Sequence, residues 1–171
     1  MFIIKGKRIH VLTTRFNPKT YIENMEYKKT IGFHGTLYGS PKTISQKIPN
    51  NSICFVIEML NLPKTHKDYP GKIVGIGLLK NKLKDRRCMI YSDQNYNRYT
   101  YFGGFHIGRE QLLHEHSEFI HSIEHSVFRG KGHLKRAQGI TCVPESFLRK
   151  HETIAVDIYN LFCKHVQTFQ D

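Results

Sequence analysis

A glycine-rich basic segment, residues 128–139 with the sequence FRGKGHLKRAQG, gathers the side chains best suited to bind phosphate. Its cations and its histidine are Arg129, Lys131, His133, Lys135 and Arg136, and it contains no acid. Glycine lets backbone N–H groups approach a ligand closely, and the cations attract phosphate. The order G-x-x-x-x-G-K-[ST] of a nucleotide-hydrolysing loop is absent. The segment therefore predicts sequence-independent phosphate contact, with a solvated loop or a catalytic loop as alternatives.

A histidine-rich stretch offers a second kind of chemistry. On a continuous helix, His114, Glu118, His121 and His125 would form one stripe, at offsets of 0, 4, 7 and 11 residues. Histidines four residues apart can share a metal ion, and Glu118 would then act as a further ligand or a base. The pattern is not H-E-x-x-H, and one exposed helix does not enclose a metal. We therefore favour a polar helix face that gains positive charge near pH 6.

Tyrosines and phenylalanines are concentrated between residues 91 and 105. They are Tyr91, Tyr96, Tyr99, Tyr101, Phe102 and Phe105, with Arg98 among them. An exposed aromatic face can stack on an unpaired base, and neighbouring amides can bond to the edge of that base. Core packing is the alternative for at least one face of the strand. Tyr96, Tyr99 and Tyr101 are the candidate base contacts.

The positive charge of the chain is unevenly distributed. The formal net charge is +12, of which residues 1–50 contribute +7 and residues 72–136 contribute +6, whereas residues 137–171 contribute −1. The second basic segment includes Lys80, Lys82, Lys84, Arg86 and Arg87. A charge confined to part of the chain favours a surface that binds a polyanion. The alternative is a lysine content raised by the base composition of the coding sequence.

Hydrophobic periodicity and turn residues predict one α+β domain over residues 1–171. A hairpin is expected over 2–12, strands over 52–60, 72–80, 87–92 and 99–107, and helices over 18–30, 40–48, 109–128 and 144–169. Gly75 and Gly77 share one face of their strand, as the sharp bends of a small barrel require. The last helix should pack against that barrel.

Cysteine usage and hydropathy predict a soluble, intracellular protein of the cytoplasm, the nucleus or a virion. No C-x-x-C pair occurs among the four cysteines, and no apolar run is long enough to span a bilayer. We therefore expect no membrane partner, and nothing in the sequence indicates a cofactor.

Residues 52–81, SICFVIEMLNLPKTHKDYPGKIVGIGLLKN, resemble the central strand, loop and strand of the PUA-like superfamily, particularly its EVE and YTH domains. The stretch KIVGIGLLK matches the family pattern xVxGxAxV. This resemblance implies a small β-barrel with flanking helices that binds RNA or modified DNA and seats a modified base in an aromatic pocket. YTH pockets use tryptophan, which this chain lacks, so tyrosine or phenylalanine would form the platform. The whole chain is also similar to small proteins of large DNA viruses.

Three functions follow as hypotheses. The leading one is a non-enzymatic nucleic-acid-binding module, in which the basic segments hold phosphates and the tyrosines contact bases. The second is a nuclease-like enzyme that processes phosphodiesters, using His133 beside Lys135 and Arg136 or using the histidine stripe with a metal. The third is a structural or assembly protein whose basic face neutralises nucleic acid or binds an acidic partner.

Overall fold

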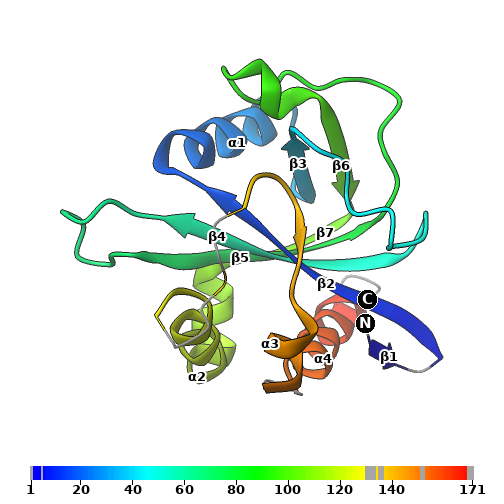
Figure 1. Ribbon diagram of the computed structural model, residues 1–171, viewed down its shortest axis with the longest axis vertical. Coiled ribbons are helices and arrows are strands. Elements are labelled where there is room, and N and C mark those ends of the chain that lie inside the picture. The colour runs from blue at the N-terminus through cyan, green and yellow to red at the C-terminus, as the bar shows by residue number, and fades with distance from the viewer. Residues whose placement is uncertain (1, 5, 130–133, 135–136, 151–152, 169–171) are drawn as a thin grey trace.

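The computed structural model describes residues 2–4, 6–129, 134, 137–150 and 153–168, and it confirms the α+β class (Figure 1). The strands are β1 (Phe2–Ile4), β2 (Lys7–Phe16), β3 (Thr36–Ser40), β4 (Ile53–Asn61), β5 (Gly71–Lys80), β6 (Tyr99–Gly103), β7 (Phe105–Gly108) and β8 (Thr141–Cys142). The helices are α1 (Pro18–Thr30), α2 (Arg109–Phe128), α3 (Glu145–Lys150) and α4 (Ile154–Thr168), with a 3₁₀ turn η1 (Gln94–Asn97).

The main sheet has the strand order β1-β2-β4-β5-β7, and β8 pairs with β2. Strands β2 and β4 are parallel, whereas the other pairs in this sheet are antiparallel. A second sheet is formed by β3 and β6. Neither sheet closes into a barrel within the described residues.

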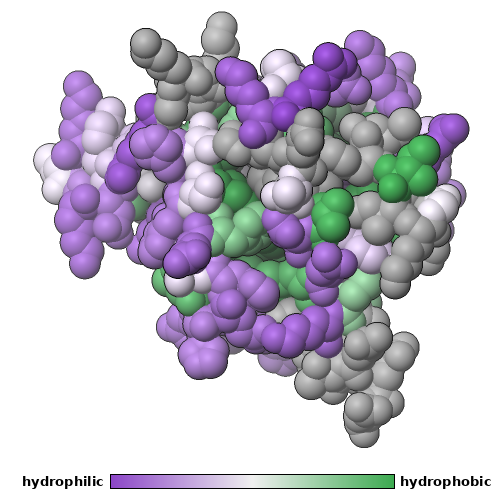
Figure 2. All heavy atoms as spheres, turned by 90° about the horizontal axis from the view of Figure 1, so that it is seen from below, coloured by the Kyte–Doolittle hydropathy of each residue, from purple (hydrophilic) through white to green (hydrophobic). Residues whose placement is uncertain are grey.

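The main sheet lies between α2, α3 and α4 on one side and α1 with the second sheet on the other (Figure 1). A hydrophobic core fills the space on each side of it. Alternate residues of β2 and β4 face opposite sides, as the pleat of a strand requires. Val11 and Ile57 pack with α2 and α4, whereas Leu12 and Val56 pack towards the second sheet and the segment that precedes η1. Seen from the helical side, most of the coloured surface is hydrophilic, and hydrophobic atoms are visible in a hollow near its middle and in a group at the right edge (Figure 2).

Several expected elements are confirmed. The hairpin turns at Gly6, whose φ of +75° suits glycine, and α1 has the expected bounds. Strands β4 and β5 lie within one residue of their expected positions, and α2 spans the expected residues.

The expected helix over 40–48 is wrong. The hydroxyl of Ser40 donates to the carbonyl of Lys42 at 2.6 Å, and the N–H of Ile44 donates to the hydroxyl of Tyr101 at 2.9 Å. These bonds satisfy the backbone without a helical ladder, a competition typical of serine. Residues 41–48 therefore form bends and turns.

The expected strand over 87–92 is also wrong, because a buried asparagine takes the place of a partner strand. Oδ1 of Asn97 accepts hydrogen bonds from the N–H groups of Ile90 and Tyr91, and its Nδ2 donates to the carbonyl of Tyr91 at 2.6 Å. The segment is thereby tied to η1 rather than to a sheet.

Two other elements are divided. The strand expected over 99–107 splits at Gly104, so that β6 joins β3 while β7 joins β5. The helix expected over 144–169 is two helices, α3 and α4. The carbonyl of Thr153 accepts from the N–H of Asp157 at 2.8 Å, and threonine is a favoured residue at a helix start.

No helix within the described part of the chain has both the length and the apolar character that a membrane crossing requires.

Candidate functional site

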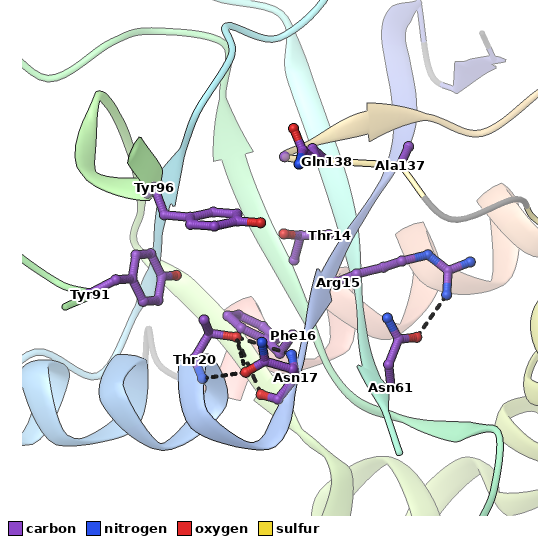
Figure 3. Close-up of a pocket in the computed structure, with 12 residues that line it drawn as sticks. Thr14, Arg15, Phe16, Asn17, Thr20, Asn61, Tyr91, Tyr96, Ala137 and Gln138 are labelled. Carbon is purple, nitrogen blue, oxygen red and sulfur yellow. Dashed lines mark hydrogen bonds between the residues drawn. The ribbon is translucent and has the colours of Figure 1, made fainter. Parts of the chain in front are cut away.

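A pocket of about 150 Å³ lies where β2 leads into α1 (Figure 3). We call it the Tyr96 pocket. Its lining consists of Thr14, Arg15, Phe16, Asn17, Thr20, Gly39, Asn61, Tyr91, Tyr96, Ala137, Gln138 and Gly139. The lining combines aromatic rings, amides, hydroxyls and one guanidinium group, and it contains no carboxylate.

The base of the pocket is fixed by the start of α1. Asn17 is the N-cap, and its Oδ1 accepts from the N–H of Thr20 at 2.8 Å. The hydroxyl of Thr20 accepts in return from the N–H of Asn17 at 3.0 Å, which completes a capping box. Pro18 follows at the first helical position, where its missing N–H costs nothing. Both polar side chains are therefore held in place.

Arg15 forms the positive wall of the pocket. Its Nη1 donates to Oδ1 of Asn61 at 2.9 Å, and its Nη2 donates to the carbonyl of Leu134 at 2.7 Å. The guanidinium also lies 5.8 Å from the centre of the Phe128 ring. These contacts tie the guanidinium to β4 and to Leu134 of the glycine-rich basic segment.

Tyr96 and Tyr91 form the opposite, aromatic wall (Figure 3). Their ring centres are 6.2 Å apart and the rings meet edge to face. Tyr91 is buried, and the Nδ2 of Asn24 donates to its hydroxyl at 3.1 Å. Burial raises the pKa of the Tyr91 hydroxyl, which therefore stays protonated. Tyr96 is half-buried, so part of its ring is left for a ligand.

The third wall is the end of the glycine-rich segment, residues 137–139. Gly139 has a φ of +79°, and a Cβ there would lie 2.5 Å from Oγ of Ser40. This glycine lets the segment pass close to the end of β3. The segment therefore enters the pocket wall directly after its basic residues.

The predicted cations of this segment are only partly described. Arg129 is exposed, and its Nη2 donates to the carbonyl of Tyr69 at 3.1 Å. Lys131, His133, Lys135 and Arg136 lie outside the described residues.

The cations of the other segments are exposed. They are Lys80, Lys82, Lys84, Arg86, Arg87 and Arg98. Arg87 is fixed against η1, because its Nε and Nη2 donate to the carbonyls of Asn97 and Gln94. Arg98 directly follows η1. Lys84 instead lies over the ring of Phe102, with Nζ 3.6 Å from the ring centre. Arg87 and Arg98 thus border the turn that carries Tyr96.

The three predicted base contacts have different positions. Tyr96 lines the pocket. Tyr99 is half-buried and packs against the core. Tyr101 is 1% exposed and its hydroxyl accepts from the N–H of Ile44, so its ring presents no open face to a base. Tyr101 belongs to the hydrophobic core that also contains Ile44 and Tyr38, its partner across the β3–β6 pair.

The histidine stripe is interrupted. His116 has φ −145° and ψ 41°, a kink that lies between His114 and Glu118. The side chains of His114, Glu118, His121 and His125 are exposed. Within the described residues, no three histidine, cysteine or acidic side chains gather closely enough to hold a metal ion.

Arg15, Asn17 and Asn61 are polar lining residues that sequence reasoning missed. The dipeptide Asn17-Pro18 carried a usable signal, because asparagine before proline is typical of a helix start. Arg15 and Asn61 gave no such signal, since they meet only through the parallel pairing of β2 and β4. Comparison of the chain with protein-family models, curated proteins and solved structures gives no match.

Proposed function

We propose that this chain is a non-enzymatic nucleic-acid-binding module of the PUA-like kind. One unstacked base occupies the Tyr96 pocket, and cations around the pocket hold the neighbouring phosphates. The observation that carries this proposal is the pocket lining, in which the half-buried ring of Tyr96 lies across from Thr14 and Arg15, beside several amides and without a carboxylate.

The size of the pocket supports a single planar ring. Cavities of about 150 Å³ accept benzene, so this pocket suits a six-membered ring. The ring of Tyr96 offers a stacking surface, and stacking on an aromatic side chain tolerates any base. Asn17, Asn61 and Gln138 provide donors and acceptors for the base edge.

The charges near the pocket support phosphate binding. Arg87 and Arg98 border η1, and the basic segment that begins at Arg129 ends in the pocket wall. Exposed cations attract a polyanion without selecting a sequence. Base and phosphate contacts would thus lie side by side on one strand of nucleic acid.

The base contact is tested by binding labelled single strands of about ten nucleotides, RNA and DNA, to variants at Tyr96. Tyr96→Ala should weaken binding about 5- to 150-fold, because stacking contributes about 1–3 kcal/mol. Tyr96→Phe keeps the ring and should stay close to the unmodified protein. Tyr159→Ala, at a half-buried tyrosine of α4, is the matched control and should leave affinity unchanged. Equal affinity of Tyr96→Ala and the control contradicts the base contact.

The phosphate contact is tested separately by salt. Affinity should fall with a log–log slope of several units between about 50 and 200 mM salt, as ~5 or more phosphate contacts require. A flat response contradicts nucleic-acid binding. Displacement of the oligonucleotide by an acidic peptide at equal concentration would indicate an assembly protein that neutralises charge, and would also contradict the proposal.

A further inference from the structure

A buried carboxylate in the main sheet is held by a tyrosine and a histidine. Glu58 on β4 is 4% exposed. The hydroxyl of Tyr38 donates to its Oε1 at 2.6 Å, and both carboxylate oxygens lie 3.0 Å from Nε2 of His106 on β7. The three side chains form a continuous hydrogen-bonded chain across three strands, which we call the Glu58 network.

The two glycines of β5 make room for this network. A Cβ at Gly75 would lie 2.6 Å from Oε2 of Glu58 and 2.7 Å from Nε2 of His106. A Cβ at Gly77 would collide with the hydroxyl of Tyr38. The prediction that these glycines bend a barrel is therefore replaced by a different role, because they accommodate buried polar groups. Buried ionisable groups that bond to one another are weak evidence for stability, and such groups beside a pocket are typical of functional sites.

His106 connects the network to a second pocket, of about 190 Å³, which we call the His106 pocket. Its lining includes Phe105 and Phe162 as apolar surfaces and His34 as a second imidazole. The side chain of His106 is 15% exposed. Its Nε2 is engaged by Glu58, and within the described residues no hydrogen bond reaches Nδ1.

We propose that the His106 pocket binds a small aromatic molecule carrying one O–H or N–H group, and that Nδ1 of His106 accepts the proton of that group. The volume slightly exceeds that of a cavity that accepts benzene. The aromatic ring of the ligand lies against Phe105 and Phe162. Its polar hydrogen points to Nδ1, the ring nitrogen that Glu58 does not occupy.

The carboxylate of Glu58 stabilises the positive charge that the proton transfer creates on His106. The ligand O–H bond breaks, an N–H bond forms at Nδ1, and Nε2 keeps its hydrogen bond to Glu58. The ligand becomes an anion and His106 becomes an imidazolium between two negative groups. A buried carboxylate stabilises such an imidazolium and fixes its tautomer, as in hydrolase triads.

The surroundings keep Glu58 ionised for this role. Burial by itself raises the pKa of Glu58. This effect is outweighed by His106, through its charge once it is protonated and through its hydrogen bond, by the hydroxyl of Tyr38 and by the charge of Lys28, so the pKa is lowered. Lys28 is buried on α1, and its Nζ donates to the carbonyl of Gly35 at 3.4 Å. His34, at the pocket rim, is the other titratable group among the lining residues.

The test compares phenol with anisole, which has the same ring and no O–H group. Binding is measured from histidine ring signals in NMR titrations of the full chain. Phenol should bind more tightly than anisole and shift the signals of His106. Glu58→Gln should weaken phenol binding about tenfold, because the charge that supports the accepting nitrogen is lost, and should leave anisole binding unchanged. His106→Gln should have the same effect, and His121→Gln, at an exposed histidine of α2, is the control.

A purely structural role of the Glu58 network would give a different result. Glu58→Gln would then weaken the binding of phenol and of anisole by the same factor, and this result overturns the proposal. Equal affinity of the two ligands for the unmodified protein, or no binding of either, also overturns it. Proton transfer is followed with 4-nitrophenol, whose phenolate is coloured. Binding to the unmodified protein should increase the absorbance of the phenolate, and the increase should be smaller in Glu58→Gln and His106→Gln. An absorbance spectrum that does not change on binding contradicts proton transfer.

Discussion

The carboxylate of Glu58 on β4 and the imidazole of His106 on β7 lie 3.0 Å apart although β5 runs between their strands. They meet because Gly75 on β5 carries no side chain. Strand β5 thus has no side chain at this position, and the space is filled by two ionisable groups that contact each other.

The space above Gly75 is tested by Gly75→Ala. The added methyl group would collide with Glu58 and His106, so the variant should lose about 1–3 kcal/mol of unfolding free energy in urea titrations. Gly104→Ala is the matched control, since nothing lies within 4 Å of a Cβ there. Equal unfolding free energies of the two variants would show that Glu58 and His106 can move to make room for the methyl group without loss of stability.

The ionisation of Glu58 predicts a pH dependence of stability. Its pKa in the folded protein is below the ordinary value of 4.5, so the unfolded chain takes up its proton first as the pH falls. The stability that Glu58 contributes is therefore complete above pH 4.5 and is lost progressively below it. Unfolding free energies measured between neutral pH and the acid range should fall less steeply in Glu58→Gln. Parallel curves for the two proteins would contradict an ionised Glu58.

Asn97 supports the turn that carries Tyr96. Asn97→Ala would leave the N–H groups of Ile90 and Tyr91 without their acceptor in a buried site, which should cost about 2–4 kcal/mol in thermal or urea unfolding. Asn95→Ala, at an exposed position of the same turn, should change stability by less than about 0.5 kcal/mol. A mild effect at Asn97 would mean that the turn is held by other contacts.

The cysteines should differ in reactivity. Burial, followed by the nearby Cys142, raises the pKa of Cys54 to about 12, and Cys54 is fully buried. Cys142 is exposed. The thiolate is the reactive form of cysteine. Alkylation of the native protein near pH 8 should therefore modify Cys142 roughly tenfold faster than Cys54, or more, as measured by mass spectrometry. Comparable rates would indicate that β2 and β4 open readily, whereas urea should equalise the two sites.

Local sequence signals predicted those parts of the fold that depend on local interactions. Helix α1 was predicted from Pro18 and the glycine that follows its end, and the hairpin from Gly6, because caps and turns are decided within a few residues. The helix expected after Ser40 and the strand expected at residues 87–92 were wrong for a shared reason. Distant partners, Tyr101 in one case and Asn97 in the other, satisfy the backbone there.

The candidate site was predicted only in part. Tyr96 was predicted as a base contact, and it lines the Tyr96 pocket together with residues 137–139 at the end of the glycine-rich basic segment. Tyr101 was grouped with Tyr96 because strand alternation does not reveal which face of a strand is covered. Arg15 and Asn61 were missed because their contact depends on strand register, which hydrophobic periodicity does not encode. The Glu58 network was missed for the same reason.

The pairing of β8 with β2 has a consequence for the newborn chain. Thr13 and Thr141 are hydrogen-bonded across 128 positions, and the residues that follow the basic segment close the Tyr96 pocket beside them. A ribosome must therefore have synthesised the chain as far as Gly139 before this cavity exists. A nascent chain that ends after β7 would contain Tyr91, Tyr96 and the capped start of α1, but it would lack residues 137–139, which form the third wall of the pocket.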